Sequence, residues 1–322
     1  MIEVVDYDAS LANRWNQFVE TAKNGHFMFN RGYMDYHKDR FPDRSLVFLK
    51  KNKVVALLPA HGPTGDGVAP GTITSHGGLS FGGILSGRSM NVRLMLEVVE
   101  ALLGHIAGRG WTRLDYAAMP HLYHAFPAEE DLYALIEHGA TRTRTRASCA
   151  LRIGSFPGYN KSRKNLLTGA RQQADIEVGE YHDLATFYDM LCVFLKRRRG
   201  AAPVHTHEEL GLLVGRFPEN IKMFAASRKG ELLAVEMVFE TPTCYRLQYK
   251  ASSEQGFALH ASDLIEDFLI HEYGQPGRWV DFGTSVMPDS QLLDKPLIQY
   301  KESFGARVVL QDNYRLELSP NC

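Results

Sequence analysis

Residues 111–120 read WTRLDYAAMP, and residues 279–288 read WVDFGTSVMP. Each segment runs from a tryptophan through a short apolar strand with an aspartate to a Met-Pro pair. A second match follows at a similar distance, because HGATRT at 138–143 corresponds to FGARVV at 304–309. Two matches in near register indicate that the chain carries two copies of one folding unit.

The predicted elements on either side of these segments follow one order in both halves. Apolar runs around a polar turn predict a hairpin, and apolar spacing of three and four predicts a helix. The first half gives a hairpin over 45–60, a strand near 73–75, a helix over 91–107, a strand over 111–117, a short helix over 131–138 and a bent strand or strand pair over 142–153. The second half gives a hairpin over 221–240, a strand over 244–251, a helix over 261–273, a strand over 279–283, a short helix over 296–304 and a final strand pair over 308–318.

The chain of 322 residues is long enough for two hydrophobic cores. We predict an α/β fold of the α+β kind, with tandem duplicated domains that each hold a mixed, mostly antiparallel sheet flanked by helices. The N-terminal domain is expected over 1–154 and the C-terminal domain over 221–322. Apolar spacing within residues 155–220 predicts a largely helical bridge between them.

Composition and charge exclude several classes of protein. The 36 Lys and Arg residues nearly balance the 37 Asp and Glu residues, so charge predicts neither DNA binding nor an anionic-membrane role. The chain has no apolar run of about 18 residues and no apolar signal segment at its start, which predicts a cytoplasmic protein without a membrane span. The widely spaced cysteines predict free thiols in a reducing compartment and no zinc site: Cys149, Cys192, Cys244 and Cys322.

Six stretches occur in an order and spacing that point to a known family. They are SHGGLSFGG at 75–83, YAAMPHLYHAFPAEEDLYAL at 116–135, PVHTHEELGLLVGRFPENIKMF at 203–224, LQYKASSEQGFALHASDLI at 247–265, VDFGTS at 280–285 and YKESFGARVVLQDNYRLEL at 300–318. Over about residues 15–318, the chain resembles the double-domain form of the GNAT acyltransferase superfamily, above all the Fem-type peptidoglycan aminoacyltransferases and the CelD-like acetyltransferases. The resemblance implies two GNAT-like domains and transfer of an acyl group from an acyl-CoA, such as acetyl-CoA, or from an aminoacyl-tRNA to an amine.

Glu236 is the first candidate for the catalytic base. In ELLAVEMVFE, residues 231–240, period-two alternation places Glu236 on one face with Ala234 and Val238. A carboxylate among apolar side chains is costly unless it is paired or functional, and burial raises its pKa toward the value that a base needs. The resemblance also implies a glutamate base on this strand. The alternative is an edge-strand glutamate that faces solvent.

Asp281 and Lys301 are two further catalytic candidates. Asp281 lies near the end of an apolar strand and is followed by small residues, a place where charged groups often line a site. It is expected to act as a base or to orient the acceptor, unless it caps a turn. The resemblance to Fem-type enzymes implies that Lys301 neutralises the oxyanion or holds a phosphate; the alternative is a surface pair with Glu302.

The stretch SSEQGFALHAS, residues 252–262, joins a strand to the next helix. A helix start suits a pyrophosphate, because its free N–H groups and its dipole favour an anion, and the resemblance places the donor's pyrophosphate loop here. This chain has one glycine in the stretch, fewer than the superfamily usually has, and the alternative is an ordinary strand-to-helix turn. The residues expected to bind acyl-CoA are Tyr249, Gln255, Gly256, Phe257 and Ala258.

Two histidine-bearing stretches and one serine are candidates for binding the acceptor. Glycines in SHGGLSFGG let the backbone approach a ligand or another strand, and the adjacent histidine suits a base or an acceptor contact; the alternative is a structural Gly-rich turn. In PVHTHEEL the first histidine is expected to contact substrate or to cap a helix, and no metal is expected because the spacing supplies no third ligand. Basic tracts around 161–171 and 196–199 are expected to be solvated helix faces or contacts to a sugar diphosphate, a CoA phosphate or a tRNA. The predicted acceptor-binding residues are His76, Gly77, Gly78, His205 and Ser285.

Together these features predict an N-acyltransferase. It is expected to move an acyl group, expected to be acetyl, from acyl-CoA to an amine of an amino sugar or nucleotide sugar in surface polysaccharide synthesis, without a covalent intermediate or a metal. One alternative is a Fem-type transferase that takes an amino acid from aminoacyl-tRNA to a cell-wall precursor. Another is a non-catalytic binding protein on the same scaffold.

Overall fold

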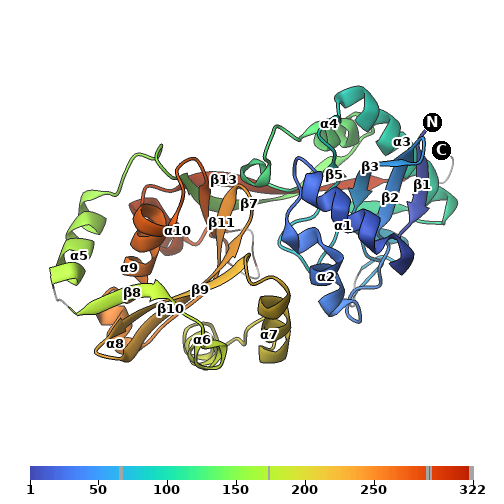
Figure 1. Cartoon of the computed structure of the whole chain (residues 1–322). Helices are drawn as coiled ribbons and strands as arrows, with labels where there is room; N and C mark the ends of the chain where they lie inside the picture. The colour runs from blue at the N-terminus through green and yellow to red at the C-terminus, as the bar shows by residue number, and fades with distance from the viewer. Residues whose placement is uncertain (65–67, 173–174, 288–289, 291, 319–322) are drawn as a thin grey trace. The chain divides into compact units, whose positions relative to one another are not determined.

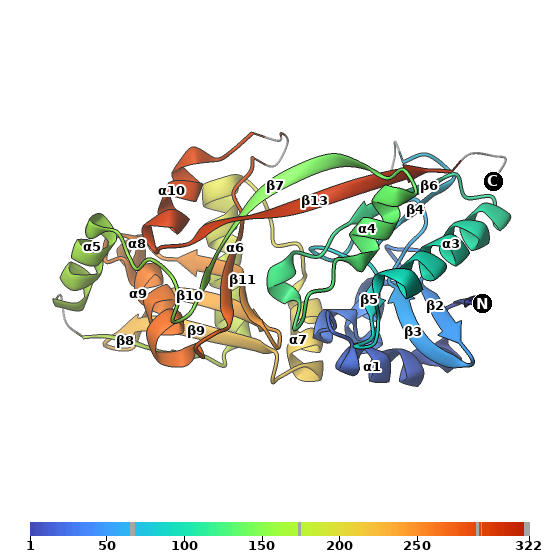
Figure 2. The same ribbon diagram turned by 90° about the horizontal axis from the view of Figure 1, so that it is seen from above.

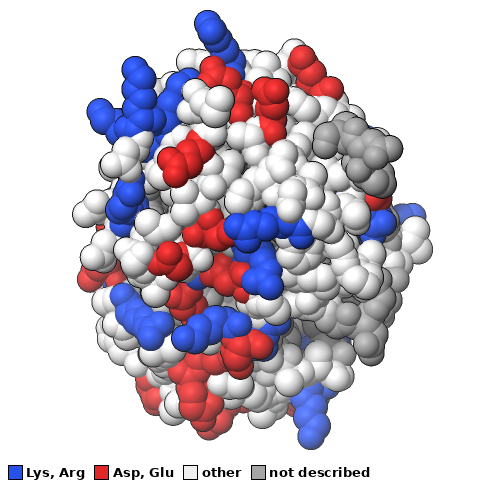
Figure 3. Space-filling model, turned by 90° about the vertical axis from the view of Figure 1, so that its right-hand side faces the viewer, with Lys and Arg blue, Asp and Glu red and all other residues white. Residues whose placement is uncertain are grey.

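The computed structural model describes residues 1–64, 68–172, 175–287, 290 and 292–318. Within them the sheets are mixed and mostly antiparallel and are flanked by helices, which confirms the predicted fold class. No helix in these ranges combines the length and the apolar character needed to cross a bilayer. Lys and Arg side chains are interspersed with Asp and Glu on the face shown in Figure 3, in keeping with the net charge of −1. Three cysteines are free thiols, and Cys322 lies outside the described residues.

Two compact units divide the chain in a way that differs from the predicted segments. The first unit holds Met1–Arg146 and the chain from Leu310 onward, and the second holds Ala147–Val309. Residues 155–220, predicted as a separate bridge, lie within the second unit. The cause is two long strands, β7 (Thr141–Arg152) and β13 (Arg307–Glu317), each of which begins in one unit and ends in the other.

The first unit contains two groups of strands. One sheet has the order β1-β2-β3-β5 and is antiparallel, with the predicted hairpin over 45–60 at its centre. In the second group β6 lies between β4 and β13 (Figure 2). Arg315 of β13 forms a bidentate ion pair with Asp115 of β6 at 2.6 and 3.0 Å. The strand bounds are β1 Glu3–Asp6, β2 Leu46–Lys50, β3 Lys53–Leu58, β4 Thr72–Thr74, β5 Leu85–Ser86 and β6 Arg113–Ala117.

Helices cover these strands and close the core of the first unit. The helix predicted over 91–107 is observed as α3, and its first turn is capped by the side chain of Asn91. Its apolar face packs with Phe48 and Tyr116 in one buried cluster. The bounds are α1 Ala12–Thr21, α2 Arg31–Met34, α3 Val92–Gly108 and α4 Glu130–Glu137, with 3-10 turns at Ala9–Leu11, Phe27–Phe29, Asp35–His37 and His121–Tyr123.

The second unit is built on one sheet with the order β7-β12-β11-β10-β9-β8 (Figure 1). β8, β9, β10 and β11 follow one another in antiparallel register, and α9 packs on the side of the sheet formed by β8, β9 and β10. The strands are β8 Ile176–Glu180, β9 Ile221–Arg228, β10 Glu231–Glu240, β11 Cys244–Ser252 and β12 Trp279–Thr284. The helices are α5 Lys161–Gln172, α6 Leu184–Arg199, α7 His207–Arg216, α8 Glu254–Ala258, α9 Ala261–Phe268, a π-helical turn at Leu269–Tyr273 and α10 Lys295–Ser303.

One prediction about the elements is wrong, and another is incomplete. Residues 308–318 were expected to form a strand pair but form the single strand β13, because Asn313 in their middle pairs with Ala117 of β6 instead of turning back. The bridge predicted as helical contains α5, α6 and α7, but it also contains the strand β8, which pairs with β9.

β11 and β12 form the parallel pair of the second unit, and their pairing is short. Register partners extend only from Cys244 and Trp279 to Arg246 and Asp281. β11 then continues to Ser252 without a partner on that side. Beyond Arg246 the ladder bonds between the two strands therefore cease, and side chains at these strand ends can line a space.

Candidate active site

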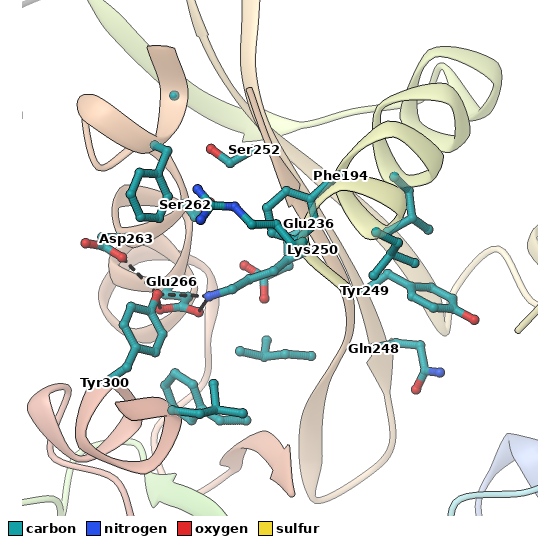
Figure 4. Close-up of a pocket in the computed structure, with 18 of the residues that line it drawn as sticks. Phe194, Glu236, Gln248, Tyr249, Lys250, Ser252, Ser262, Asp263, Glu266 and Tyr300 are labelled. Carbon is teal, nitrogen blue, oxygen red and sulfur yellow. Dashed lines mark hydrogen bonds and ion pairs between the residues drawn. The ribbon is translucent and has the colours of Figure 1, made fainter. Parts of the chain in front are cut away.

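A cavity of about 950 Å³ lies where β11 and β12 part (Figure 4). Its walls come from α5, α6, the chain that follows α6, β10, β11, α8, α9, β12 and α10, all within the second unit. Apolar side chains from α6 and β11 line one part, and charged side chains from β10, β11 and α9 line another. The size and the mixed lining are typical of a small-molecule site.

Glu236 is the most unusual group in this wall. It lies in β10, is 0% exposed, and neither carboxyl oxygen has a hydrogen-bond partner among the described residues. Burial raises the pKa of Glu236 well above its usual value, and the nearby Glu266 carboxylate raises it further, while the Lys250 ammonium acts in the opposite direction. Glu236 is therefore a carboxyl group that lines a cavity and keeps its proton to a higher pH than an exposed glutamate does.

Lys250 lies opposite Glu236 in the β10–β11 register but directs its ammonium group elsewhere. Lys250 Nζ lies 2.7 Å from Glu266 Oε1 and donates to the Tyr300 hydroxyl at 2.9 Å (Figure 4). That hydroxyl in turn lies 2.6 Å from Glu266 Oε2 and 2.8 Å from Asp263 Oδ1. Strand β11 and helices α9 and α10 are thus joined by one buried network beside Glu236.

Arg163 of α5 completes this network. Its guanidinium forms an ion pair with Asp263 and lies over the Tyr300 ring, 4.8 Å from the ring centroid. Asp263 is thereby paired with Arg163, and Glu266 is paired with Lys250. Each of these ion pairs is neutral by itself. Glu236 is therefore the one acid of these three that has no ion-pair partner among the described residues.

Lys301 of α10 lines the same cavity and is almost fully buried. Its Nζ donates to the backbone carbonyl oxygens of Gly283 and Thr284, at 2.8 Å each, just past the paired part of β12. Burial lowers the pKa of Lys301 to about 8, opposed by the neighbouring Cys149 and Asp281. Because an ammonium carries three hydrogens, one remains for a ligand after these two bonds.

Asp281 is buried in β12 but is not among the residues that line the cavity. Its carboxylate accepts hydrogen bonds from Ser148 Oγ at 3.0 Å, from Arg246 Nη1 at 2.9 Å and from the Gly283 N–H at 2.8 Å. These bonds hold β12 against β7 and β11, next to the carbonyls that bind Lys301. Ser285 is also fully buried and lies outside the cavity wall.

The stretch expected to hold pyrophosphate forms the short helix α8. The Gly256 N–H donates to the capping side chain of Ser253 at 3.0 Å, and a Cβ on Gly256 would overlap the backbone carbonyl of Leu233 in β10. The one glycine of this stretch is thus required by the packing of α8 on β10. Gly256 and Phe257 line the cavity, whereas Gln255, whose amide lies 2.9 Å from Glu231, and Ala258 do not.

Tyr249 and His205 form a pair at the edge of the cavity. Tyr249 lines the wall, and its hydroxyl lies 2.6 Å from Nδ1 of the buried His205. Burial raises the pKa of Tyr249 to about 12. His205 is not itself among the lining residues, but its neighbours Pro203 and Val204 are.

The HGG motif at 76–78 lies in the first unit and is not among the residues of this wall. Gly77 packs on the ring of His61 and Gly78 on the ring of His37, so close that a Cβ at either position would overlap those rings. The imidazole of His76 is buried beside both rings. Among the described residues, no group of three or more His, Cys, Asp or Glu is arranged to hold a metal.

Sequence analysis missed Lys250, Asp263 and Glu266. For Lys250 the sequence gives no simple signal, because counting outward from the turn of the hairpin places Tyr249 opposite Glu236. The register shift between Met237 and Val238 is what brings Lys250 opposite Glu236. A signal for the acids lies in ASDLIEDF at 261–268, where Asp263 and Glu266 stand three residues apart on a helix that must pack on a sheet. The sequence marks Arg163 only as part of a basic tract. Tyr300, like Tyr249, is a candidate acid for the leaving thiolate on sequence grounds, with a core or rim position as the alternative.

Comparisons with solved structures show the fold of the whole chain. FemX gives a TM-score of 0.69 at 10% identity, over 98% of this chain and 97% of that one. L-PGS from Bacillus licheniformis gives 0.57 at 11% identity, over 95% and 91%. A tandem GNAT protein from the clavulanic acid biosynthesis pathway gives 0.54 at 16% identity, over 100% of both chains. No family model and no curated protein matches the sequence. The chain therefore has the double-GNAT, Fem-like fold, as the order of its elements predicted.

Proposed function

We propose that this protein is an N-acyltransferase that moves an acyl group, acetyl in the simplest case, from acyl-CoA to a primary amine. The double-GNAT fold is the scaffold on which such chemistry is expected. The observation that carries the proposal is Glu236, a fully buried carboxyl without a hydrogen-bond partner among the described residues, on the wall of a cavity of about 950 Å³. A carboxyl with a raised pKa exchanges protons at working pH, as an acid–base catalyst must.

In the proposed reaction the neutral amine attacks the thioester carbonyl. A C–N bond forms, the carbonyl electrons move onto oxygen, and they return as the C–S bond breaks with its electron pair on sulfur. The ionised form of Glu236 takes the proton that the amine nitrogen loses, and the neutral form returns that proton to the thiolate. The products are an amide and free CoA, and Glu236 ends in the state in which it began.

Lys301 is proposed to stabilise the oxyanion. Two of its hydrogens are bound to the carbonyls of Gly283 and Thr284, and this fixes the direction of the third. A preorganised cation in a buried site stabilises developing negative charge more than it would in water. Asp281 is proposed as a positioning residue, because it orders the segment of β12 that carries these carbonyls.

The proposed acceptor is the amine of an amino sugar or nucleotide sugar. Hydroxyl and amide groups on the same wall suit an acceptor that is rich in hydroxyls; they belong to Gln248, Ser252, Ser262 and Thr284. An amine nucleophile suits Glu236, because the attacking nitrogen loses a proton that the ionised carboxylate on the same wall can accept. His205 is proposed to act on the acceptor only through Tyr249.

Aminoacyl-tRNA is a second candidate donor, and one observation favours it. The Gly256 N–H is already bound to Ser253, and the first residue of α8 is the acidic Glu254, so this helix start offers little to a pyrophosphate. The chemistry at Glu236 is the same with an ester donor, except that the leaving group is a ribose oxygen in place of sulfur.

The test compares wild type with Glu236→Gln, with acetyl-CoA as donor and glucosamine as acceptor. Mass spectrometry follows the N-acetylated product, and calorimetry follows CoA binding. We expect turnover to fall by about 100-fold or more while CoA affinity stays unchanged. Glu177→Gln, an exposed residue of β8, is the matched control and is expected to keep wild-type turnover. Full turnover in Glu236→Gln would refute the proposed role. Binding of tRNA without binding of CoA would point to the second donor, and CoA binding without turnover by wild type would favour a binding protein.

A further inference from the structure

The last turn of α6 brings one exposed cation, Arg198, to the wall of the cavity, together with Val204 and Phe257; these three residues are called the cavity mouth. Lys196 and Arg197 precede Arg198 and are also exposed, but they are not among the lining residues. Val204 and Phe257 are exposed apolar residues on the same wall, and Phe257 is 61% exposed. The mouth thus combines a water-accessible cation with apolar surface.

The other cations that line the cavity already have partners. Arg163 is paired with Asp263, and Lys250 with Glu266. Lys301 donates to two backbone carbonyls. Arg198 differs, because its guanidinium lies over the Phe257 ring, 4.5 Å from the centroid, and has no acidic partner among the described residues.

Arg197 lies beside Arg198 in the chain and binds the start of α8, the helix that carries Phe257. Its guanidinium forms an ion pair with Glu254 of α8, and both side chains are largely exposed. An exposed ion pair of this kind contributes little to stability, so an incoming anion can displace the carboxylate at little cost. Arg197 and Arg198 together can then present two guanidinium groups to one ligand.

We propose that Arg198, with Arg197 beside it, binds a phosphate group of the acyl donor at the cavity mouth. The proposal rests on the proposed function, because it assigns the charged end of the donor whose acyl group reaches Glu236. A phosphate at the mouth stays partly hydrated, while the part of the donor that carries the acyl group enters between α6 and β11. Guanidinium groups bind phosphate oxygens in bidentate fashion. CoA and tRNA both supply such a phosphate.

Calorimetry on Arg198→Ala, on the double variant with Arg197→Ala, and on Arg228→Ala tests the proposal. The ligands are CoA, pantetheine, which lacks phosphate, and unfractionated tRNA, each at low and moderate salt. We expect Arg198→Ala to weaken CoA binding by about tenfold, since it removes a charge-assisted hydrogen bond to phosphate, and the double variant to weaken it further. Pantetheine affinity is expected to stay unchanged. Arg228 of β9 lies in the same unit outside the cavity wall and is the matched control.

The outcomes separate the two donors and the two proposals. A loss confined to CoA assigns the phosphate to CoA, and a loss confined to tRNA assigns it to tRNA; both support the phosphate site. Unchanged affinity for both ligands in Arg198→Ala, equal losses for pantetheine and CoA, or no binding of either ligand by wild type would overturn it. If Glu236→Gln keeps full turnover while Arg198→Ala weakens binding, the phosphate site stands and the catalytic proposal fails.

Discussion

Glu236 and Lys250 are register partners in the β10–β11 pair, yet the Lys250 ammonium binds Glu266 Oε1 at 2.7 Å and leaves Glu236 without a hydrogen bond among the described residues. The reason is that Lys250 also meets the Tyr300 hydroxyl on the Glu266 side, at 2.9 Å. A cross-strand acid–base pair is thereby replaced by a lysine bound to a helix and a glutamate whose ionised form lacks a partner. The predictions below follow from this arrangement and from the packing around it.

Glu236→Gln is expected to gain stability over wild type as pH rises. Because burial raises the folded-state pKa of Glu236 above its unfolded value, the native state keeps a proton that the unfolded chain releases. The contribution of Glu236 to the free energy of unfolding is therefore complete below the unfolded pKa and is lost as pH rises toward the folded one. Glutamine cannot ionise and does not show this loss. Urea unfolding at about pH 5, 7 and 9 measures it, and a difference between the two proteins that does not change with pH would contradict the prediction.

Lys301→Met is expected to lower turnover and to remove one limb of the pH profile. With the pKa of Lys301 lowered to about 8, its ammonium form is lost as pH rises through that value. Wild-type kcat/KM should therefore fall above about pH 8, whereas Lys301→Met should be slower by about 100-fold and lack that limb. Lys295→Met, an exposed position at the start of α10, is the control and should follow wild type. The same alkaline limb in Lys301→Met would show that another group titrates.

Asp281→Asn is expected to lower the free energy of unfolding strongly and to lower turnover only slightly. The change replaces the carboxylate that binds Arg246, Ser148 and the Gly283 N–H by a neutral amide. Loss of the buried ion pair with Arg246 costs about 3 kcal/mol. Unfolding in urea measures that loss. Product formation at a temperature where the variant is folded should stay within about tenfold of wild type. A loss of turnover as large as that of Glu236→Gln, in a fully folded variant, would instead make Asp281 catalytic.

Gly256→Ala and Gly104→Ala should change stability in opposite directions. A Cβ at Gly256 overlaps the backbone carbonyl of Leu233, which cannot move without disturbing β10, so a loss of about 3 kcal/mol is expected. Gly104 lies inside α3 with open space around it, and alanine there should add about 0.5 to 1 kcal/mol. Thermal unfolding of both variants tests the pair. Equal effects would show that α8 can shift away from β10.

The buried histidines of the first unit should make the protein sensitive to acid. Burial lowers the pKa of His61, and it lowers the pKa of His76 well below the usual value, with His37, His61 and Arg31 adding repulsion to His76. The unfolded chain then binds protons that the native state does not, so stability is complete above the unfolded pKa and falls as pH drops below about 6.5. His76→Gln should make the plot of unfolding free energy against pH less steep between about pH 7 and 5. An unchanged slope would exclude His76 as a source of the effect.

Sequence alone determined the double-GNAT fold and marked Glu236 as a candidate for a buried carboxyl. The order of hairpin, strand, helix and strand recurs in both halves, and alternation around Glu236 in 231–240 marks it as a carboxyl among apolar neighbours. Both are local properties of the chain, because strand and helix periods are set by residues within a few positions of one another. The structure places that carboxyl at 0% exposure, which decides against the alternative of a glutamate that faces solvent.

Tertiary structure alone decided what surrounds Glu236 and where the units end. The bonds of Lys250 join it to Glu266, 16 residues away, and to Tyr300, 50 residues away. In the first unit, Arg315 of β13 forms an ion pair with Asp115 of β6, 200 residues earlier in the chain. A strand from the C-terminal part of the chain thus pairs with a strand of the N-terminal part. No periodicity encodes such distances, because the partner of a buried charge or of a strand edge is fixed by which surfaces pack together.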